Sequence, residues 1–176
     1  MSEMVELTPT PGLNDELLPG DEIWLLYHLM QGGEWFVNWQ IGKLETKFDE
    51  DGRFILKSYE YDPEGFRLRL KIIVRNEPLT PTQRAGSAES IILGALLGVV
   101  ATVLYGMIMG EATTEKHLRN IDLINANANL TPEQKTQAIN AEVQEIGKPS
   151  DLSSMAGALM FVGVAILALV LLGVKR

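Results

Sequence analysis

Residues 90–110 read SIILGALLGVVATVLYGMIMG, and this stretch decides how the rest of the chain is interpreted. It carries no charge, and its apolar run, Ile91–Met109, is interrupted only by glycines and Thr102. A helix of about 19 residues is about 28 Å long, which is close to the roughly 30 Å hydrocarbon core of a bilayer. The stretch therefore predicts a transmembrane helix, and the similar apolar run at residues 155–174 predicts a second one.

Small residues recur at every fourth position of the first predicted span. They are Ser90, Gly94, Gly98, Thr102, Gly106 and Gly110. At 3.6 residues per turn, this spacing places them along one slowly drifting stripe of the helix. Small residues let helix backbones approach closely in lipid, where the hydrophobic effect contributes little to helix association. We expect the stripe to pack against the second span of the same chain, against other copies of the protein, or against a different subunit.

The composition excludes several classes of function. The chain has 176 residues and a formal net charge of −8 at pH 7, which argues against nucleic acid as a partner because phosphates require a basic surface. The absence of cysteine excludes disulfides, thiolate metal sites and cysteine nucleophiles. The first residues, MSEMVELTPTPG, lack the basic and apolar regions of a signal peptide. We therefore expect the part before the first span to stay on the cytosolic side.

The region before the first span predicts an acidic arm followed by a small sheet. Residues 1–22 contain no lysine or arginine and are broken by prolines and glycines, so we expect them to be irregular. Residues 23–76 predict an antiparallel β meander. Its clearest strand is Phe66–Arg75, where apolar and mostly basic residues alternate. The expected hairpin partner is Arg53–Tyr61, joined through the turn sequence at residues 62–65.

Two further strands are expected in the same region. Asp51-Gly52 is a hairpin signal that would lead back to a strand over Trp35–Phe48, with a β-bulge near Gly42, where the apolar positions change parity. Residues 23–30 fit a strand, and they also fit a short helix capped by Asp21; we favour the strand. The predicted core of the meander consists of Trp24, Trp35, Trp39, Phe54 and Phe66.

Residues 77–89 contain prolines and a glycine and predict a short linker, which would hold the sheet near the lipid headgroups. One row of basic residues on the last strand would then face anionic lipid, each charge contributing about 1 kcal/mol. The alternative is a solvated face that pairs with Glu45, Glu60 or the acidic arm. The residues of this basic row are Arg67, Arg69, Lys71 and Arg75.

Residues 111–154 predict a helical hairpin between the two spans. The first helix is expected over Thr113–Asn125. Thr131-Pro132-Glu133-Gln134 combines an N-cap threonine, a proline at the first helical position and a glutamine suited to a capping box. This second helix is expected to end near Ile146, just before a glycine.

The distribution of positive charge predicts the orientation in the membrane. Arg75 and Arg84 precede the first predicted span, and Lys175 and Arg176 follow the second. Positively charged residues concentrate on the inner side of a membrane. Both termini are therefore expected inside and the helical hairpin outside, in an inner membrane of bacterial type or a virion membrane.

The sequence contains no recognisable catalytic or cofactor motif. A phosphate loop, a dinucleotide fingerprint, an HExxH motif and a nucleophile elbow are all missing. His28 and His117 would lie on opposite sides of the membrane and could not share a metal ion. Neither predicted span contains the ionisable groups that pumps and transporters require. We expect no catalytic, cofactor-binding or metal-ligating residue, and no enzymatic activity.

These patterns together predict an α+β membrane protein: a small N-terminal antiparallel β meander followed by two transmembrane helices separated by an extramembrane helical hairpin. The expected function is that of a non-enzymatic, two-span structural or assembly subunit of a larger membrane complex or membrane-containing virus particle. The alternatives are a homo-oligomeric pore or ring former and a membrane-tethered protein-binding module. The expected partners are other membrane protein subunits, copies of the chain itself and the lipid bilayer.

Overall fold

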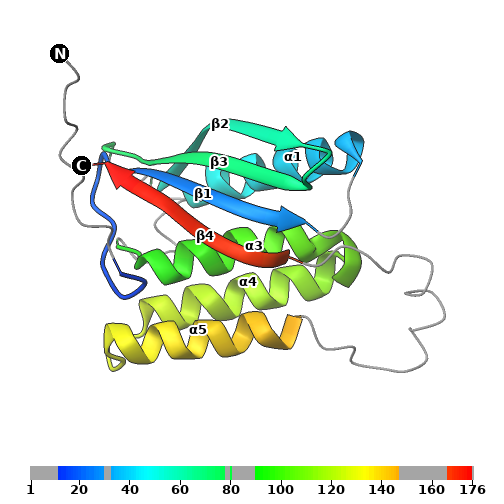
Figure 1. Ribbon diagram of the computed structural model, residues 1–176. Coiled ribbons are helices and arrows are strands. Elements are labelled where there is room, and N and C mark those ends of the chain that lie inside the picture. The colour runs from blue at the N-terminus through cyan, green and yellow to red at the C-terminus, as the bar shows by residue number, and fades with distance from the viewer. Residues whose placement is uncertain (1–11, 30–32, 78–79, 81–89, 147–165, 176) are drawn as a thin grey trace, which may run out of the picture.

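The computed structural model describes residues 12–29, 33–77, 80, 90–146 and 166–175. These residues form an α+β fold in which helices pack on one face of a four-stranded antiparallel sheet of order β2-β3-β1-β4 (Figure 1). The strands are β1 (Glu22–Leu29), β2 (Phe54–Asp62), β3 (Arg67–Val74) and β4 (Ile166–Lys175). The helices are α1 (Glu34–Asp51), α3 (Leu93–Met109), α4 (Glu111–Ala126) and α5 (Pro132–Ile146).

One face of the sheet is buried because apolar residues alternate with polar or less buried ones along its strands. The register places Leu25 of β1 directly opposite Leu70 of β3, so the buried rows of the two strands meet. The buried row consists of Ile23, Leu25, Tyr27 and Leu29 of β1 and Leu68, Leu70, Ile72 and Val74 of β3. These residues and the buried faces of α1 and α3 form one core cluster, with α4 and α5 packed against α3 (Figure 1).

The strand predicted over Trp35–Phe48 is wrong, because residues 34–51 form helix α1. The change of parity near Gly42 belongs to a helical spacing of buried residues and marks no bulge. Gly52 ends the helix: it adopts φ 79°, and its N–H donates to the carbonyl of Phe48 at 2.8 Å. The buried residues of α1 are Phe36, Val37, Gln40, Ile41, Leu44 and Phe48.

The expected aromatic core is also partly wrong. Trp35 and Trp39 lie on the outward side of α1, where they are 67% and 42% exposed, and Phe66 is 38% exposed. Phe54 is buried and packs against Phe48 of α1, with ring centroids 5.4 Å apart. The core is instead built mainly from aliphatic side chains of the sheet, α1 and α3.

The principal correction concerns residues 90–110. Helix α3 lies between the sheet and the α4–α5 hairpin, and every residue from Ile91 to Leu104 is buried (Figure 1). No helix in the described part of the chain has both the length and the apolar character needed to cross a membrane. A helix that is apolar all round must be surrounded by apolar material, and here the protein itself supplies it. The first transmembrane helix predicted from the sequence is therefore wrong.

The second predicted span is corrected as well. Residues 155–165 lie outside the described part of the chain, while Ile166–Lys175 forms strand β4 and pairs antiparallel with β1. The two-span membrane fold, the extramembrane hairpin and the integral membrane location all depended on these helices and are not supported. The same correction applies to the membrane subunit, the pore or ring former and the membrane-tethered module.

Other local predictions are confirmed. Strands β1, β2 and β3 coincide with the expected strands, including the strand rather than the helix at residues 23–30. In the turn before β3, Asp62 Oδ1 accepts the N–H groups of Glu64 and Gly65 at 3.1 Å each. The capping box of α5 is also present: Gln134 N–H donates to Thr131 Oγ1 at 3.2 Å, and Thr131 N–H donates to Gln134 Oε1 at 2.9 Å.

The start of α3 is held by the segment that precedes β1. Leu93 N–H donates to the carbonyl of Asp15 at 2.9 Å, and Gly94 N–H donates to the carbonyl of Leu13 at 2.8 Å. Part of the predicted arm thus runs alongside the helix end and joins it through an isolated bridge between Glu16 and Ile92. The first N–H groups of a helix have no partner within the helix, so these bonds allow α3 to begin in an apolar interior.

Asn125, a buried residue of α4, supplies further hydrogen bonds at the N-terminal end of α3. Asn125 Oδ1 accepts the N–H of Ile92 at 3.3 Å, and the Asn125 side-chain amide donates to the carbonyl of Ser90 at 2.9 Å. Asn125 is 5% exposed, so its amide is available only to these backbone groups and their neighbours. A polar side chain is tolerated at this depth because its hydrogen bonds are formed.

Tyr27 offers a test of the core. Its buried hydroxyl has no hydrogen-bond partner among the described residues, and burial raises the pKa of Tyr27 well above its ordinary value. An unpaired buried polar group costs about 1–3 kcal/mol, so we expect Tyr27→Phe to raise the free energy of unfolding by about 1 kcal/mol in urea denaturation.

Tyr59→Phe is the matched control for this prediction. The Tyr59 hydroxyl is exposed and donates to Asn38 Oδ1 at 3.0 Å, so its removal should leave the free energy of unfolding unchanged or slightly lower. A loss of stability on Tyr27→Phe would contradict the prediction, because it would mean that the hydroxyl forms a favourable contact.

Candidate functional site

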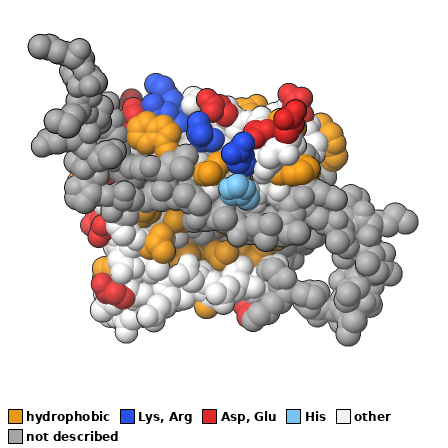
Figure 2. All heavy atoms as spheres, viewed as in Figure 1, with side chains coloured by type: hydrophobic (Ala, Val, Ile, Leu, Met, Phe, Trp, Pro, Cys, Tyr) orange, Lys and Arg blue, Asp and Glu red, His pale blue; other side chains and the backbone are white. Residues whose placement is uncertain are grey.

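The basic row predicted to face lipid lies on the outer face of the sheet and at its end. Figure 2 shows that Lys and Arg side chains on this face are interspersed with Asp and Glu side chains. Each basic residue of the row is paired with a carboxylate, and its contact with lipid headgroups stays a prediction. The pairs are Arg67–Asp62 at 2.7 Å, Arg69–Glu60 at 3.3 Å, Lys71–Glu22 at 3.2 Å and Arg75–Asp49 at 3.4 Å.

The small-residue stripe of α3 faces other segments of the same chain. A Cβ atom built on Gly98 would lie 2.7 Å from Ile139 Cγ2 of α5. One built on Gly94 would lie 3.0 Å from the carbonyl oxygen of Leu13. Both glycines therefore stand where the neighbouring segment approaches too closely for a larger residue.

The remaining members of the stripe have different surroundings. Thr102 is buried and donates to the carbonyl of Gly98 at 2.7 Å. A Cβ atom on Gly106 would lie 3.0 Å from Thr114 Oγ1 of α4. Gly110 forms the corner between α3 and α4 at φ 82°, a conformation that favours glycine. Ser90, at the other end of the stripe, is exposed and precedes the helix.

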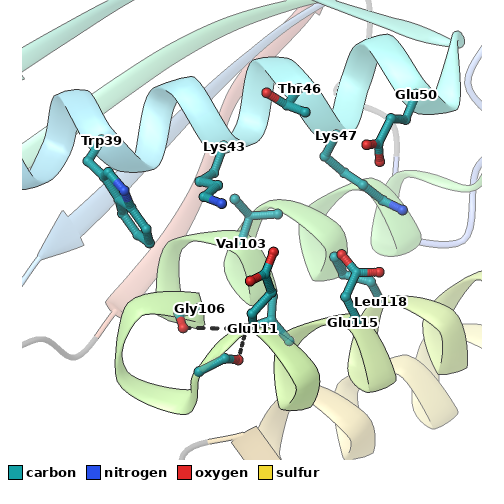
Figure 3. Close-up of a pocket in the computed structure, with 12 residues that line it drawn as sticks. Trp39, Lys43, Thr46, Lys47, Glu50, Val103, Gly106, Glu111, Glu115 and Leu118 are labelled. Atoms are coloured by element: carbon teal, nitrogen blue, oxygen red, sulfur yellow. Dashed lines mark hydrogen bonds between the residues drawn. The ribbon is translucent and has the colours of Figure 1, made fainter.

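The described residues enclose a groove of about 360 Å³ between α1 and the corner where α3 meets α4 (Figure 3). This volume is in the range of small-molecule sites. Three elements contribute: Trp39, Lys43, Thr46, Lys47 and Glu50 from α1; Val103, Gly106 and Gly110 from α3 and its end; and Glu111, Thr114, Glu115 and Leu118 from α4.

Two rows of opposite charge face each other across this groove. Lys43 and Lys47 are one turn apart on α1, and Glu111 and Glu115 are one turn apart on α4 (Figure 3). Among the residues that the structure describes, no ion pair within 4.0 Å joins the two rows; Lys47 lies 3.9 Å from Asp122 instead. The two rows are thus complementary in charge and separated by the width of the groove.

One end of the groove is apolar and aromatic. The indole of Trp39 is 42% exposed, and the ammonium group of Lys43 lies 5.6 Å from its ring centroid, in cation–π contact. Buried Val103 and Leu118 form the wall beneath the charged rows. The groove therefore combines an apolar surface with both signs of charge.

A buried charge cluster adjoins the groove at the end of α1. The guanidinium of Arg53 donates to both carboxylate oxygens of Asp51, at 2.6 and 2.5 Å, and lies 3.9 Å from Asp122. Burial raises the pKa of Asp122, and this outweighs the opposing effects of Lys47 and Arg53; Asp51 and Glu115 raise it further. Asp122 is therefore a carboxyl group whose charged form is disfavoured.

The two histidines lie on different elements. His28 is on the outer side of β1, whereas His117 of α4 lies with Nδ1 2.5 Å from Glu142 Oε1 of α5. Asn120 donates to the same carboxylate oxygen at 2.9 Å, so the three side chains join α4 to α5. Within the described ranges, no three acidic or histidine residues form a group that could hold a metal ion.

Comparisons of this chain with protein-family models, with curated proteins and with solved structures found no match in any of the three.

Gly98 tests how closely α3 and α5 pack. We expect Gly98→Ala to lower the free energy of unfolding by about 1–3 kcal/mol in urea denaturation, because the new methyl would overlap Ile139. Ile139→Ala removes that contact, so the double variant should lose less than the two single variants together, by at least about 0.5 kcal/mol. Ile146→Ala is the control: it truncates a different buried residue of α5, and its effect should add to that of Gly98→Ala.

The raised pKa of Asp122 predicts that the free energy of unfolding depends on pH. Its pKa is raised in the folded protein, so the folded state binds this proton more tightly than the unfolded state, and the free energy of unfolding falls as pH rises through the interval between the two pKa values. We expect Asp122→Asn to raise the free energy of unfolding near neutral pH by less than about 1 kcal/mol. Arg53 keeps Asp51 as its partner in this variant.

The gain from Asp122→Asn should shrink as the pH is lowered through the raised pKa, because wild-type Asp122 is then already neutral. Urea denaturation between about pH 4 and pH 8 measures this. Glu45→Gln, at an exposed position of α1, is the control and should not change the pH dependence. A gain that is the same at every pH would contradict the assignment to Asp122.

Proposed function

We propose that this protein is a non-enzymatic binding protein whose ligand is a small zwitterion with an apolar side group, such as a free aromatic amino acid. The binding site is the groove between α1 and α4. The observation that supports the proposal is the pair of opposite charge rows, Lys43 with Lys47 and Glu111 with Glu115, which face each other across an open groove without pairing.

The charges of the groove favour a ligand that carries both signs. A ligand ammonium group between Glu111 and Glu115 and a ligand carboxylate beside Lys43 would each form charge-assisted hydrogen bonds. A ligand with a single charge would satisfy one row and leave the other facing an apolar or like-charged group, at a cost in desolvation. Lys47 is less available than Lys43 because its ammonium group already lies near Asp122.

The apolar end of the groove favours an aromatic or large aliphatic side group. Trp39 offers a partly exposed indole face, and Val103 and Leu118 are apolar neighbours within the same lining. Offset stacking between two aromatic rings contributes about 0.5–1.5 kcal/mol beyond the area that it buries. The ligand would therefore be held by its side group as well as by its two charges.

The lining residues support binding rather than catalysis. Those that the structure describes include no histidine, serine or cysteine, so the groove lacks the usual nucleophile–base pair. Its lysines are held by an indole and by a carboxylate: Lys43 lies over Trp39, and Lys47 lies 3.9 Å from Asp122. These observations are the basis for proposing a protein without enzymatic activity.

Isothermal titration calorimetry with three matched ligands tests the proposal. L-phenylalanine carries both charges, phenethylamine lacks the carboxylate, and 3-phenylpropionate lacks the ammonium group. We expect L-phenylalanine to bind at least about tenfold more tightly than either analogue, which corresponds to about 1.4 kcal/mol. Equal binding of phenethylamine would instead indicate a cation site, and no heat of binding from any of the three would overturn the proposal.

Two charge-neutralising variants test which residues contact the two charged groups of the ligand. Lys43→Met and Glu111→Gln should each weaken binding of L-phenylalanine by about tenfold, because each removes one of the two charge contacts. Lys57→Met is the matched control, because Lys57 is exposed on β2 and does not line the groove. This variant should bind L-phenylalanine as tightly as the unmodified chain does. Loss of binding in the control would show that net charge, rather than the groove, determines affinity.

A further inference from the structure

Helix α1 presents two tryptophans to solvent. Trp35 is 67% exposed and Trp39 is 42% exposed, and they lie one turn apart on the same helix. Tryptophan is enriched among the residues that dominate binding energy at protein interfaces. This pair therefore marks the outward side of α1 as a surface to be explained.

Gly42 lies on the same side, in the middle of α1. A Cβ atom built there would meet no other atom within 4 Å, so nothing in the described part of the chain requires glycine at this position. Glycine inside a helix costs roughly 0.5–1 kcal/mol relative to alanine. A close approach from outside the chain would account for its presence.

The outward residues form one seam along the helix. Trp35, Trp39, Gly42 and Thr46 follow one another at intervals of four, three and four residues, the spacing that keeps side chains on the contact line between two packed helices. The seam has two large side chains in its N-terminal half and two small ones in its C-terminal half. If a second copy of the helix runs in the opposite direction, its large side chains lie opposite the small residues of the first copy.

We propose that a second copy of this chain packs its α1 antiparallel against this seam, around a two-fold axis between Trp39 and Gly42. Trp39 of each copy then covers Gly42 of the other, and Trp35 covers Thr46. Such an isologous contact uses the same patch twice, as two-fold symmetry requires. A parallel arrangement would place tryptophan on tryptophan and leave a void at the glycines.

The charges at the ends of α1 support the antiparallel arrangement. Its N-terminus follows Gly33, which provides no side-chain cap, and its last turn contains Asp49 and Glu50 but no basic residue. An antiparallel partner would bring the acidic last turn of each copy near the uncapped N-terminus of the other, where the helix dipole favours negative charge. This contact would add to the compensation that Glu34 in the first turn and the Asp49–Arg75 pair already provide within one chain.

The tryptophans supply part of the area that a dimer needs. The exposed parts of the four tryptophans together amount to on the order of 400 Å². A specific interface requires roughly 1,000 Å² in total, so the rest must come from the polar residues that flank the seam. Trp39 and Thr46 also line the ligand groove, so the dimer would cover part of its apolar end. Trp35 and Gly42 lie outside the groove, so the dimer can be tested through Gly42 without any ligand.

Sedimentation equilibrium of the full chain over a wide range of concentration tests the proposal. The unmodified chain should dimerise, and Gly42→Leu should weaken the dimer by at least about tenfold because the new side chain fills the space that Trp39 of the second copy needs. The variant should fold, since its position is open and leucine favours helix. Ala112→Leu, on the exposed side of α4, is the control and should dimerise normally.

Cross-linking tests the orientation, and the natural sequence contains no cysteine that would interfere. In an antiparallel pair, position 38 of one copy lies near position 45 of the other. A short bismaleimide should therefore link Asn38→Cys to Glu45→Cys in an equimolar mixture and should link neither variant efficiently to itself. A chain that stays monomeric, a dimer unaffected by Gly42→Leu, or efficient linking of Glu45→Cys to itself would each overturn the proposal.

Discussion

The fold depends on enclosing an apolar helix completely and still satisfying the polar groups at its ends. From Ile91 to Leu104 every residue of this segment is buried, so its first N–H groups have no access to water. They are satisfied by carbonyls of the segment before β1 and by the amide of Asn125 on α4. Three parts of the chain that are remote in sequence therefore meet at one helix end, and the sheet, the hairpin and the N-terminal segment are positioned by that requirement.

Much of the local structure could be predicted from the sequence because it depends on local signals. Alternation predicted β3, the Asp62 turn predicted its hairpin, and the Thr131 capping box predicted α5. The environment of the apolar runs could not be predicted, because burial in lipid and burial in a protein core select the same residues. Helix α1 was missed for a related reason: Trp35, Val37, Trp39 and Ile41 alternate like a strand, although only Val37 and Ile41 are buried.

The candidate binding groove could not be predicted from the sequence either. Each charge row is visible in the sequence as two like charges four residues apart, but such pairs are common on solvated helix faces. Only the three-dimensional structure places the lysines of α1 opposite the glutamates of α4, more than sixty residues later in the chain. Gly110 fixes this relation, since it joins α3 to α4 without a loop and so sets where the first turn of α4 begins. The seam of α1 could not be predicted from the sequence either. The open space around Gly42 is known only from the three-dimensional structure.

The position of β4 in the sheet has a consequence for how the chain matures. Strand β1 lies inside the sheet, but one of its two neighbours is β4, which is remote in sequence, and Glu22 pairs with Lys175. Contacts between such remote positions form slowly, and a chain emerging from the ribosome cannot form this one until residues 166–175 have been made. Until then β1 exposes an unpaired edge to other nascent chains. The β1–β4 edge of the sheet therefore closes only after the whole helical part of the fold has been made.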